Sequence, residues 1–287
     1  MMRWAAVKIE AEDVEAMNAA EQLLYNAGFK GVALNDISIP PCVTGYLPED
    51  ARLPAQLRAV DAALMLLPSI GITGLSEKAD VAFVEEQDWA NAWKKYFKPI
   101  RIGKRLVVTP PWESPDLAAD DLPIVIDPGM AFGTGSHGTT QLCLEALEQV
   151  VAPGKTVADI GTGSGILSIA AAKLGADSVY AMDIDPLAVR IATENAAVNG
   201  ATIETSEQLP EGRVFDVVVA NIIADTLIEL SETLAGFTAP GGWFIASGII
   251  NHRAADVRAA FAKAGLGEAD ERASGEWVAQ VYQRSQS

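Results

Sequence analysis

The stretch from Val157 to Asp185 constrains the fold more than any other part of this sequence. An apolar run ends at Asp159, an Ala- and Leu-rich segment follows, and a second apolar run is closed by Asp183. Between the first run and the Ala-rich segment stand three alternate glycines, Gly161, Gly163 and Gly165. This pattern is typical of a strand, a glycine turn, a helix and a parallel strand. Such a βαβ unit presents bare backbone and helix N–H groups at the end of its first strand, where nucleotides bind.

The spacing of the glycines indicates which nucleotide the turn suits. A dinucleotide-binding turn has its third glycine one place later, where this chain has Ile166, so an NAD site is disfavoured. The pattern D-x-G-x-G-x-G, followed by Asp183 at the end of the next strand, resembles motif I and the acidic loop of class I S-adenosylmethionine methyltransferases. Asp183 would accept hydrogen bonds from both hydroxyls of a ribose. A strand-to-helix turn that needs positive φ would also select glycine, but the acids that close both strands favour a cofactor site.

Length and charge narrow the class of protein. A chain of 287 residues predicts two domains rather than one. Its 21 Lys and Arg residues against 38 Asp and Glu residues give a net charge of −17, which disfavours broad electrostatic contact with nucleic acid. We therefore expect no direct nucleic-acid binding. A basic protein partner is compatible with this charge, and so is acidity that serves only solubility.

Cysteine usage and hydropathy bear on location. Cys42 and Cys143 are the only cysteines and lie far apart in sequence, which indicates neither a disulfide framework nor a cysteine-based zinc site, and no metal is expected. The first residues become charged before an apolar segment of signal-peptide length develops, and no apolar run approaches the roughly 18 residues needed to span a bilayer. We expect a cytoplasmic protein without membrane contact.

The front of the chain predicts a small α+β domain. Segments typical of strands and helices follow the order βαββαβ, over residues 3–9, 13–27, 31–37, 43–47, 53–67 and 79–85. This order is typical of a ferredoxin-like sandwich. Because no pattern within it indicates catalysis, we assign residues 1–84 to substrate recognition, although an oligomerisation module would look the same. Residues 85–99 carry aromatic side chains at helical spacing and end at a proline, which predicts a linker helix.

The remainder, residues 100–287, predicts a doubly wound α/β domain that binds S-adenosylmethionine. Seven strands are expected from Thr156 onward, with helices after most of them, and the last hairpin would add an antiparallel strand to an otherwise parallel, Rossmann-like sheet. Single helices are expected over 224–235 and 251–264, and a strand over 242–248. The ligand crevice would lie at the carboxyl ends of the strands.

A long glycine-rich loop precedes the βαβ unit. Residues 124–140 are typical of a strand that runs into this loop, and we expect the loop to fold over the cofactor as a lid. Phe132 would offer its ring to a sulfonium or an adenine, or else be a buried residue of a structural turn. His137 is a more typical capping or packing residue than a catalytic base. Three hydroxyl side chains of the loop can cap the helix expected over 141–150: Ser136, Thr139 and Thr140.

Several longer motifs are more specific than the glycine turn, which many enzyme families share. They are D-W-x-x-x-W-K-x-x-F-x-P over 88–99, I-G-x-R-L over 102–106, P-x-W-E over 110–113, D-P-G-M-A-F-G-T-G-S-H-G-T-T over 127–140 and A-N-I-I over 220–223. With these motifs, nearly the whole chain resembles the PrmA family, the bacterial methyltransferases of ribosomal protein L11. Two departures from the family pattern are Gly138, where proline is frequent, and Ile223, where leucine is usual.

The resemblance implies a set of site residues. The family's cofactor contacts fall on Thr140, Gly161, Asp183 and Asn221, and motif I adds Asp159, Gly163 and Gly165. Asn221 would also hold the target nitrogen, as the corresponding residue of amine and amide methyltransferases does, while Phe132 would face the sulfonium. From the sequence alone, a strand-terminal Asn that bonds loop amides is the simpler interpretation of Asn221.

The activity that the resemblance implies is transfer of methyl groups from S-adenosylmethionine to the α-amine and lysine amines of ribosomal protein L11. Methylation of another protein's lysines or of RNA is the nearest alternative, and the acidic charge disfavours RNA. A binding factor that keeps the cofactor domain only as a scaffold would have a damaged glycine turn, whereas this turn is intact. A nicotinamide dehydrogenase shares the fold but conflicts with Ile166.

Overall fold

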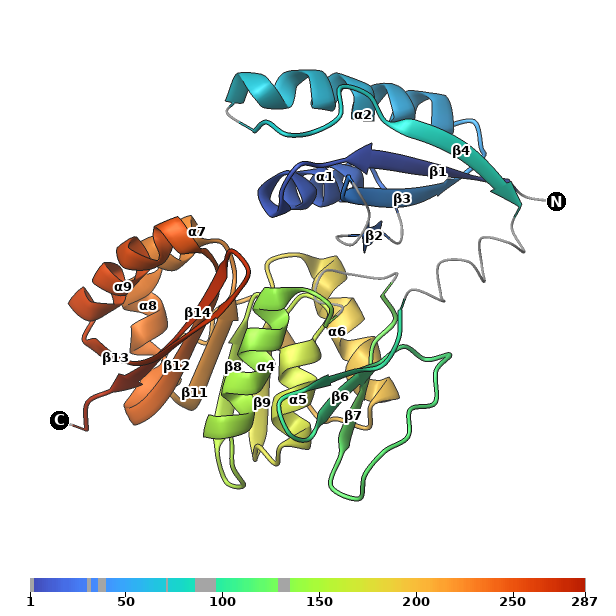
Figure 1. Ribbon diagram of the computed structural model, residues 1–287. Helices are drawn as coiled ribbons and strands as arrows, with labels where there is room; N and C mark the ends of the chain where they lie inside the picture. The colour runs from blue at the N-terminus through green and yellow to red at the C-terminus, as the bar shows by residue number, and fades with distance from the viewer. Residues whose placement is uncertain are drawn as a thin grey trace. The chain divides into compact units, whose positions relative to one another are not determined.

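The structure, a computed structural model, describes residues 3–29, 32–35, 40–70, 72–85, 97–128 and 135–286. The chain divides into two compact units, Met1–Phe97 and Lys98–Ser287, named here the front unit and the rear unit (Figure 1). The expected linker helix falls mainly on residues 86–96, which lie outside the described residues.

The front unit contains a four-stranded antiparallel sheet and two helices. Its elements are β1 (Arg3–Glu10), α1 (Val14–Asn26), β2 (Val32–Asn35), β3 (Cys42–Pro48), α2 (Leu53–Leu66), the 3-10 turn η1 (Leu67–Ile70) and β4 (Asp80–Glu85). The strands lie in the order β2-β3-β1-β4, and each neighbouring pair is antiparallel. Alternate residues of β1 are fully buried in one apolar core with Leu24 of α1 and Val60 of α2: Ala5, Val7 and Ile9. The two-residue period of β1 therefore sets the face that the helices cover.

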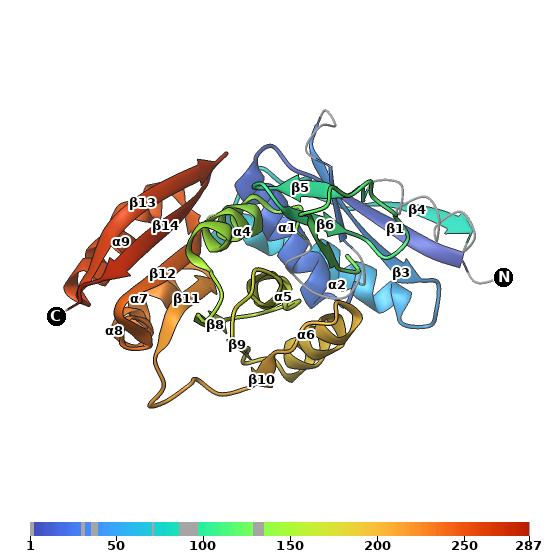
Figure 2. The ribbon, with the colours of Figure 1, turned by 90° about the horizontal axis from the view of Figure 1, so that it is seen from below.

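The rear unit is organised around a seven-stranded sheet in the order β10-β9-β8-β11-β12-β14-β13. Its strands are β8 (Thr156–Ile160), β9 (Ser178–Met182), β10 (Glu204–Ser206), β11 (Phe215–Asn221), β12 (Thr238–Ile250), β13 (Leu266–Ser274) and β14 (Trp277–Arg284). Strands β8 to β12 pair in parallel, whereas β14 is antiparallel to both of its neighbours. Figure 2 shows the strands from β10 to β13 in this order.

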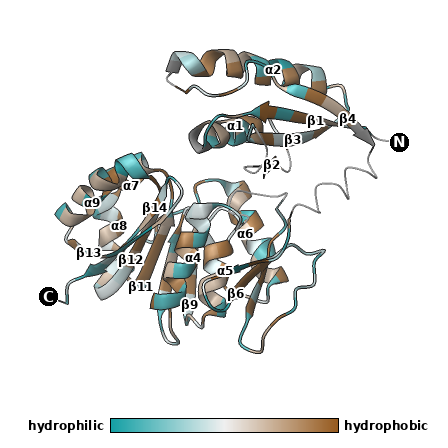
Figure 3. Cartoon of the chain, in the orientation of Figure 1, coloured by the Kyte–Doolittle hydropathy of each residue, from teal (hydrophilic) through white to brown (hydrophobic). Residues whose placement is uncertain are grey.

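Helices cover both faces of this sheet. They are α4 (Gly138–Val150), α5 (Ile166–Lys173), α6 (Pro186–Val198), α7 (Ala224–Glu229), α8 (Ser231–Gly236) and α9 (Ala254–Lys263). Neighbouring residues of β11 enter different cores: Val217 and Val219 pack with residues of α4 and α5, whereas Val218 and Ala220 pack with residues of α7, α8 and α9. Burial on both faces explains the continuous apolar run of β11, which is brown in Figure 3.

A separate three-stranded sheet was not predicted from the sequence. It packs against the apolar core that contains residues of α4 and α5. It consists of β5 (Ile100–Ile102), β6 (Leu106–Thr109) and β7 (Leu122–Val125), with β5 antiparallel and β7 parallel to β6. The Glu148 carboxylate of α4 fixes the β5–β6 turn because it accepts hydrogen bonds from the backbone N–H groups of Lys104 and Arg105, each at 2.7 Å.

Three sequence-based element predictions were wrong in extent. The helix expected over 224–235 is broken into α7 and α8 at Leu230, whose φ of −93° and ψ of 8° leave helical geometry. Leu227 and Leu234 on either side of the break still enter the same core. The segment 251–264 begins with a 3-10 turn, η3 (Asn251–Arg253), before α9, and β12 extends beyond 242–248 at both ends. Within the described ranges, no helix has both the length and the apolarity to cross a membrane.

Candidate active site

The candidate site lies where β8, β9 and β11 end. The chain proceeds from β8 to β9 on one side of β8, whereas β11 pairs with the other side. At such a reversal of strand order the loops separate and leave a crevice beyond the carboxyl ends of the strands. Asp159, Asp183 and Asn221 stand at or next to these three strand ends.

The glycine turn between β8 and α5 needs glycine for two physical reasons. Gly161, Gly163 and Gly165 all have positive φ, at 80°, 54° and 82°. A Cβ on Gly161 would lie 2.5 Å from Ile222 Cγ2, and one on Gly165 would lie 3.0 Å from Ala192 Cα in α6. The turn is also bonded to β9, because the N–H groups of Gly161 and Thr162 donate to the carbonyl of Met182 at 2.8 and 2.9 Å. Backbone geometry therefore accounts for the glycines whether or not a ligand is bound.

Asp159 lies beneath this turn and is fully buried. Its Oδ2 accepts hydrogen bonds from the Thr162 hydroxyl at 2.7 Å and from the Ser168 hydroxyl and backbone N–H at 2.7 and 3.1 Å. Burial raises the pKa of Asp159 to about 6, although these hydrogen bonds oppose the shift. Among the described residues, its buried Oδ1 has no hydrogen-bond partner. Asp159 thus ties the turn to α5 through one oxygen and keeps the other for a further donor.

Asp183 is partly exposed and is held by backbone donors. Its Oδ2 accepts from the Gly163 N–H at 2.9 Å, and its Oδ1 accepts from the Asp185 N–H at 3.0 Å. A carboxylate offers about four acceptor positions, so each oxygen can still accept from a ribose hydroxyl. The glycine turn and the acidic loop are therefore joined, and the carboxylate is oriented by the same turn that it adjoins.

The start of α4 brings a fourth group of polar residues to the site. His137 is the N-cap, and its side chain accepts from the Thr139 N–H, which confirms the capping interpretation of His137. The expectation that Ser136, Thr139 or Thr140 caps this helix was wrong. Gly138 occupies the first helical position, where proline is favoured, so this departure from the family pattern leaves the helix start in place. Thr140 is fully buried, and its hydroxyl has no hydrogen-bond partner in the described part of the chain.

Asn221 reaches the start of α4. Its Nδ2 donates to the Thr139 hydroxyl at 3.2 Å, so this partner is a helix side chain rather than a loop amide. Phe132 lies outside the described residues. Burial lowers the pKa of His137 below its usual value, which leaves the ring neutral near pH 7.

Two exposed apolar residues next to these strand ends were given no role from the sequence. Ile184, which follows Asp183, is 84% exposed, and Ile223, which lies two residues after Asn221, is 67% exposed. Other large apolar side chains among the described residues, such as Met65 and Val198, are similarly exposed, so exposure alone does not indicate a ligand contact. The signal available in the sequence was an apolar residue one or two positions after a strand-terminal polar residue.

The described residues fit an S-adenosylmethionine site. The glycine turn gives close backbone approach, and Asp183 can accept from hydroxyls. Two buried acceptors, Asp159 Oδ1 and Thr140 Oγ1, have no partner within the described part of the chain. No group of three or more His, Cys, Asp or Glu side chains in those residues is arranged to hold a metal ion. This fold with this site defines a class I, S-adenosylmethionine-dependent methyltransferase.

Comparison with known proteins identifies the family. The family described as "Ribosomal protein L11 methyltransferase (PrmA)" matches residues 3–285. The ribosomal protein L11 methyltransferase of Pelotomaculum thermopropionicum is 49% identical over 83% of this chain and 78% of its own length. That of Symbiobacterium thermophilum is 42% identical over 97% of this chain and 98% of its own. A crystal structure of ribosomal protein L11 methylase from Lactobacillus delbrueckii subsp. bulgaricus matches with a TM-score of 0.62 at 36% identity, over 66% of this chain and 100% of that one. The chain belongs to the PrmA family, which confirms the resemblance found in the sequence.

Proposed function

We propose that this protein transfers methyl groups from S-adenosylmethionine to amines of ribosomal protein L11, namely its terminal α-amine and lysine side chains. The observation that carries the proposal is a site at the ends of β8, β9 and β11 with an intact glycine turn and an oriented Asp183. The relatives that match most of this chain's length are named for the same substrate. The seven-stranded sheet supports a Rossmann-like methyltransferase domain.

The cofactor supplies a methyl group on a positively charged sulfur, and the chain's residues bind and orient the two reactants. We propose that Asp183 accepts from the ribose hydroxyls and that the turn from Gly161 to Gly165 approaches the cofactor through its backbone. Thr140 and Asp159 would offer the oxygens that have no partner among the described residues. Asn221 would accept a hydrogen bond from the target amine, and Phe132 would face the sulfonium.

The target amine must be neutral to attack the methyl carbon. A lysine in water has a pKa near 10.4, so it has to lose a proton before reaction. Desolvation in the crevice, next to a cationic sulfur, lowers that pKa, and the proton can leave through water. Most of the acceleration would then come from near-attack orientation, which can supply roughly 7 to 11 kcal/mol.

We propose that residues 1–84 recognise the protein substrate, that residues 85–99 link the units, and that residues 100–287 bind the cofactor and carry the reaction. The order β2-β3-β1-β4 with α1 and α2 supports a ferredoxin-like assignment for the front unit. The net charge of −17 suits a basic protein substrate rather than direct contact with nucleic acid, and a cytoplasmic location would suit such a substrate.

The direct test is mass spectrometry of purified ribosomal protein L11 after incubation with the full-length protein and methyl-labelled S-adenosylmethionine. Label on the α-amine and on lysines supports the proposal. Label that appears on ribosomal RNA, or on other proteins of a ribosome-free extract with L11 unmodified, would show a different methyltransferase activity.

The roles of the two units can be separated by deleting residues 1–97. The rear unit has its own cores, so the shortened protein should keep S-adenosylmethionine binding by calorimetry and lose methylation of intact L11. Equal activity of the shortened and full-length proteins on L11 would disprove the recognition role.

A further inference from the structure

Three side chains form a continuous hydrogen-bonded line that ends at the site. His137 Nδ1 lies 2.7 Å from the Thr139 hydroxyl oxygen, and Asn221 Nδ2 lies 3.2 Å from the same oxygen. Thr139 is 1% exposed, so water does not compete freely for its hydroxyl. The line joins the first turn of α4 to the carboxyl end of β11.

The positions of the protons along this line follow from donor and acceptor chemistry. His137 Nδ1 accepts the Thr139 backbone N–H at 3.4 Å as part of the helix cap. A ring nitrogen that accepts carries no proton, so the neutral imidazole holds its proton on Nε2. The Thr139 hydroxyl must then donate its single proton to Nδ1. Burial, which lowers the pKa of His137, supports the neutral ring.

This arrangement fixes the side-chain amide of Asn221. Because the Thr139 proton is already donated to His137, the hydroxyl can only accept from Asn221, and the amide must present Nδ2 to it. The carbonyl oxygen Oδ1 is therefore on the opposite side of the planar amide. If the amide were flipped, Oδ1 would face the Thr139 hydroxyl oxygen, whose only proton is donated to His137. The flipped amide would also present an N–H donor, instead of Oδ1, on its opposite side.

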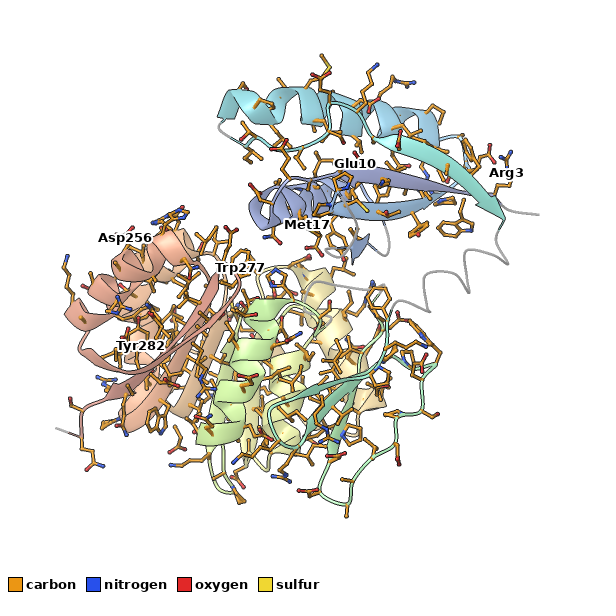
Figure 4. All side chains as sticks on the ribbon, in the orientation of Figure 1. Arg3, Glu10, Met17, Asp256, Trp277 and Tyr282 are labelled. Carbon is orange, nitrogen blue, oxygen red and sulfur yellow. The ribbon has the colours of Figure 1, made fainter. Side chains whose placement is uncertain are left out.

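We propose that His137 and Thr139 are positioning residues that hold the Asn221 amide in the one orientation in which Oδ1 can accept a proton from the target amine. This inference rests on the proposed function, in which Asn221 contacts that amine. His137 is itself held in place: its ring packs edge-on against Trp277, with centroids 5.1 Å apart, and Trp277 is labelled in Figure 4.

Kinetics of matched variants test the line. Thr139→Val keeps the shape of the side chain without its hydroxyl, so we expect kcat for L11 methylation to fall roughly tenfold, the effect of one net hydrogen bond, with little change in KM for S-adenosylmethionine. Thr139→Ser restores the hydroxyl and should restore most of kcat. Likewise His137→Leu should lower kcat, whereas His137→Asn keeps an acceptor and an N-cap and should retain most of it. Thr193→Val, which removes an exposed hydroxyl of α6, controls for loss of a threonine hydroxyl elsewhere.

A double-variant cycle distinguishes positioning from a separate structural effect. If Thr139 acts through Asn221, Thr139→Val should have no further effect on kcat once Asn221→Ala is present. A further tenfold fall in the double variant, or a parental kcat for Thr139→Val alone, would overturn the proposal. A parental rate for Asn221→Ala would instead refute the role of Asn221 in the proposed function.

The orientation itself can be measured without substrate. Nitrogen-15 NMR of the full-length protein should show the His137 proton on Nε2, and the Asn221 side-chain amide should give one stable pair of resonances that broadens or shifts in Thr139→Val. A proton on Nδ1 of the neutral ring would overturn the proposal regardless of whether L11 is the substrate.

Discussion

Replacing Asp183 by alanine should separate cofactor binding from folding. The carboxylate lies at the end of β9, is partly exposed, and accepts from the Gly163 N–H at 2.9 Å and the Asp185 N–H at 3.0 Å. These two donors orient both oxygens before any ligand arrives. The remaining acceptor positions are the ones that the proposed ribose hydroxyls would use.

The magnitude follows from the number of hydrogen bonds. Two hydrogen bonds from ribose hydroxyls to a charged acceptor contribute about 1.5 to 3 kcal/mol each, so their loss should weaken cofactor binding at least about 100-fold. The effect on folding should be much smaller. Water can replace the carboxylate at Gly163 and Asp185 because the side chain is partly exposed, so the free energy of unfolding should fall by about 1 kcal/mol.

Titration calorimetry with S-adenosylmethionine, together with denaturant unfolding, measures both quantities. Asp185→Ala is the matched control because it removes the same charge two residues away. It also removes an N-cap to Leu187 at 2.9 Å, which costs about 1 kcal/mol of stability. The control should lose stability and keep parental affinity. Parental affinity in Asp183→Ala, or an equal loss of affinity in both variants, would refute the ribose assignment.

Two further predictions concern the glycine turn and the residue beneath it. In Gly165→Ala the new Cβ would lie 3.0 Å from Ala192 Cα at a φ of 82°, so denaturant unfolding should show a larger loss than in Gly200→Ala, where φ is 61° and nothing lies within 4 Å. The control should lose about 1 to 2 kcal/mol for its backbone conformation alone, and equal losses would contradict the proposed contact with α6. Burial raises the pKa of Asp159 to about 6, above an unfolded value near 3.9, so its ionisation opposes folding as pH rises through that window. The free energy of unfolding of Asp159→Asn, relative to that of the parent, should therefore rise by up to about 3 kcal/mol from pH 4 to pH 7. A difference in unfolding free energy that does not change with pH would refute this prediction.

Local sequence patterns predicted the parts of the fold that depend on residues close together in the sequence. The mainly apolar segments at 157–160 and 215–220 were predicted as strands and form β8 and β11, and the glycines between β8 and α5 have the positive φ that the turn requires. The separate sheet of β5, β6 and β7 was not predicted, because β6 and β7 pair across a long loop and only three-dimensional contact selects the partner. The break at Leu230 was missed for a similar reason: the helical pattern is continuous, and packing of α7 and α8 against the core decides where it bends.

In the candidate site, too, local sequence predicted some features and three-dimensional contacts determined others. Sequence motifs predicted which residues gather at the strand ends, but not what each side chain contacts. The cap of α4 illustrates this: three hydroxyl side chains and His137 were all candidates for capping, and the extended residue before the helix is His137, with φ of −71° and ψ of 136°. Only the residue at that position can cap, so the backbone selects the ring nitrogen over better capping chemistry nearby.

Most polar residues of the candidate site also bond to other residues of the site, and this affects how variants must be interpreted. Asp183 binds the N–H of Gly163, Asp159 binds Thr162 and Ser168, and Asn221 binds Thr139. Loss of binding in any one variant can therefore come from a missing ligand contact or from a displaced turn. The free energy of unfolding distinguishes the two causes, because a displaced turn weakens several contacts at once and lowers that free energy. A missing contact removes affinity in proportion to its own hydrogen bonds, so affinity and stability have to be measured on the same variants.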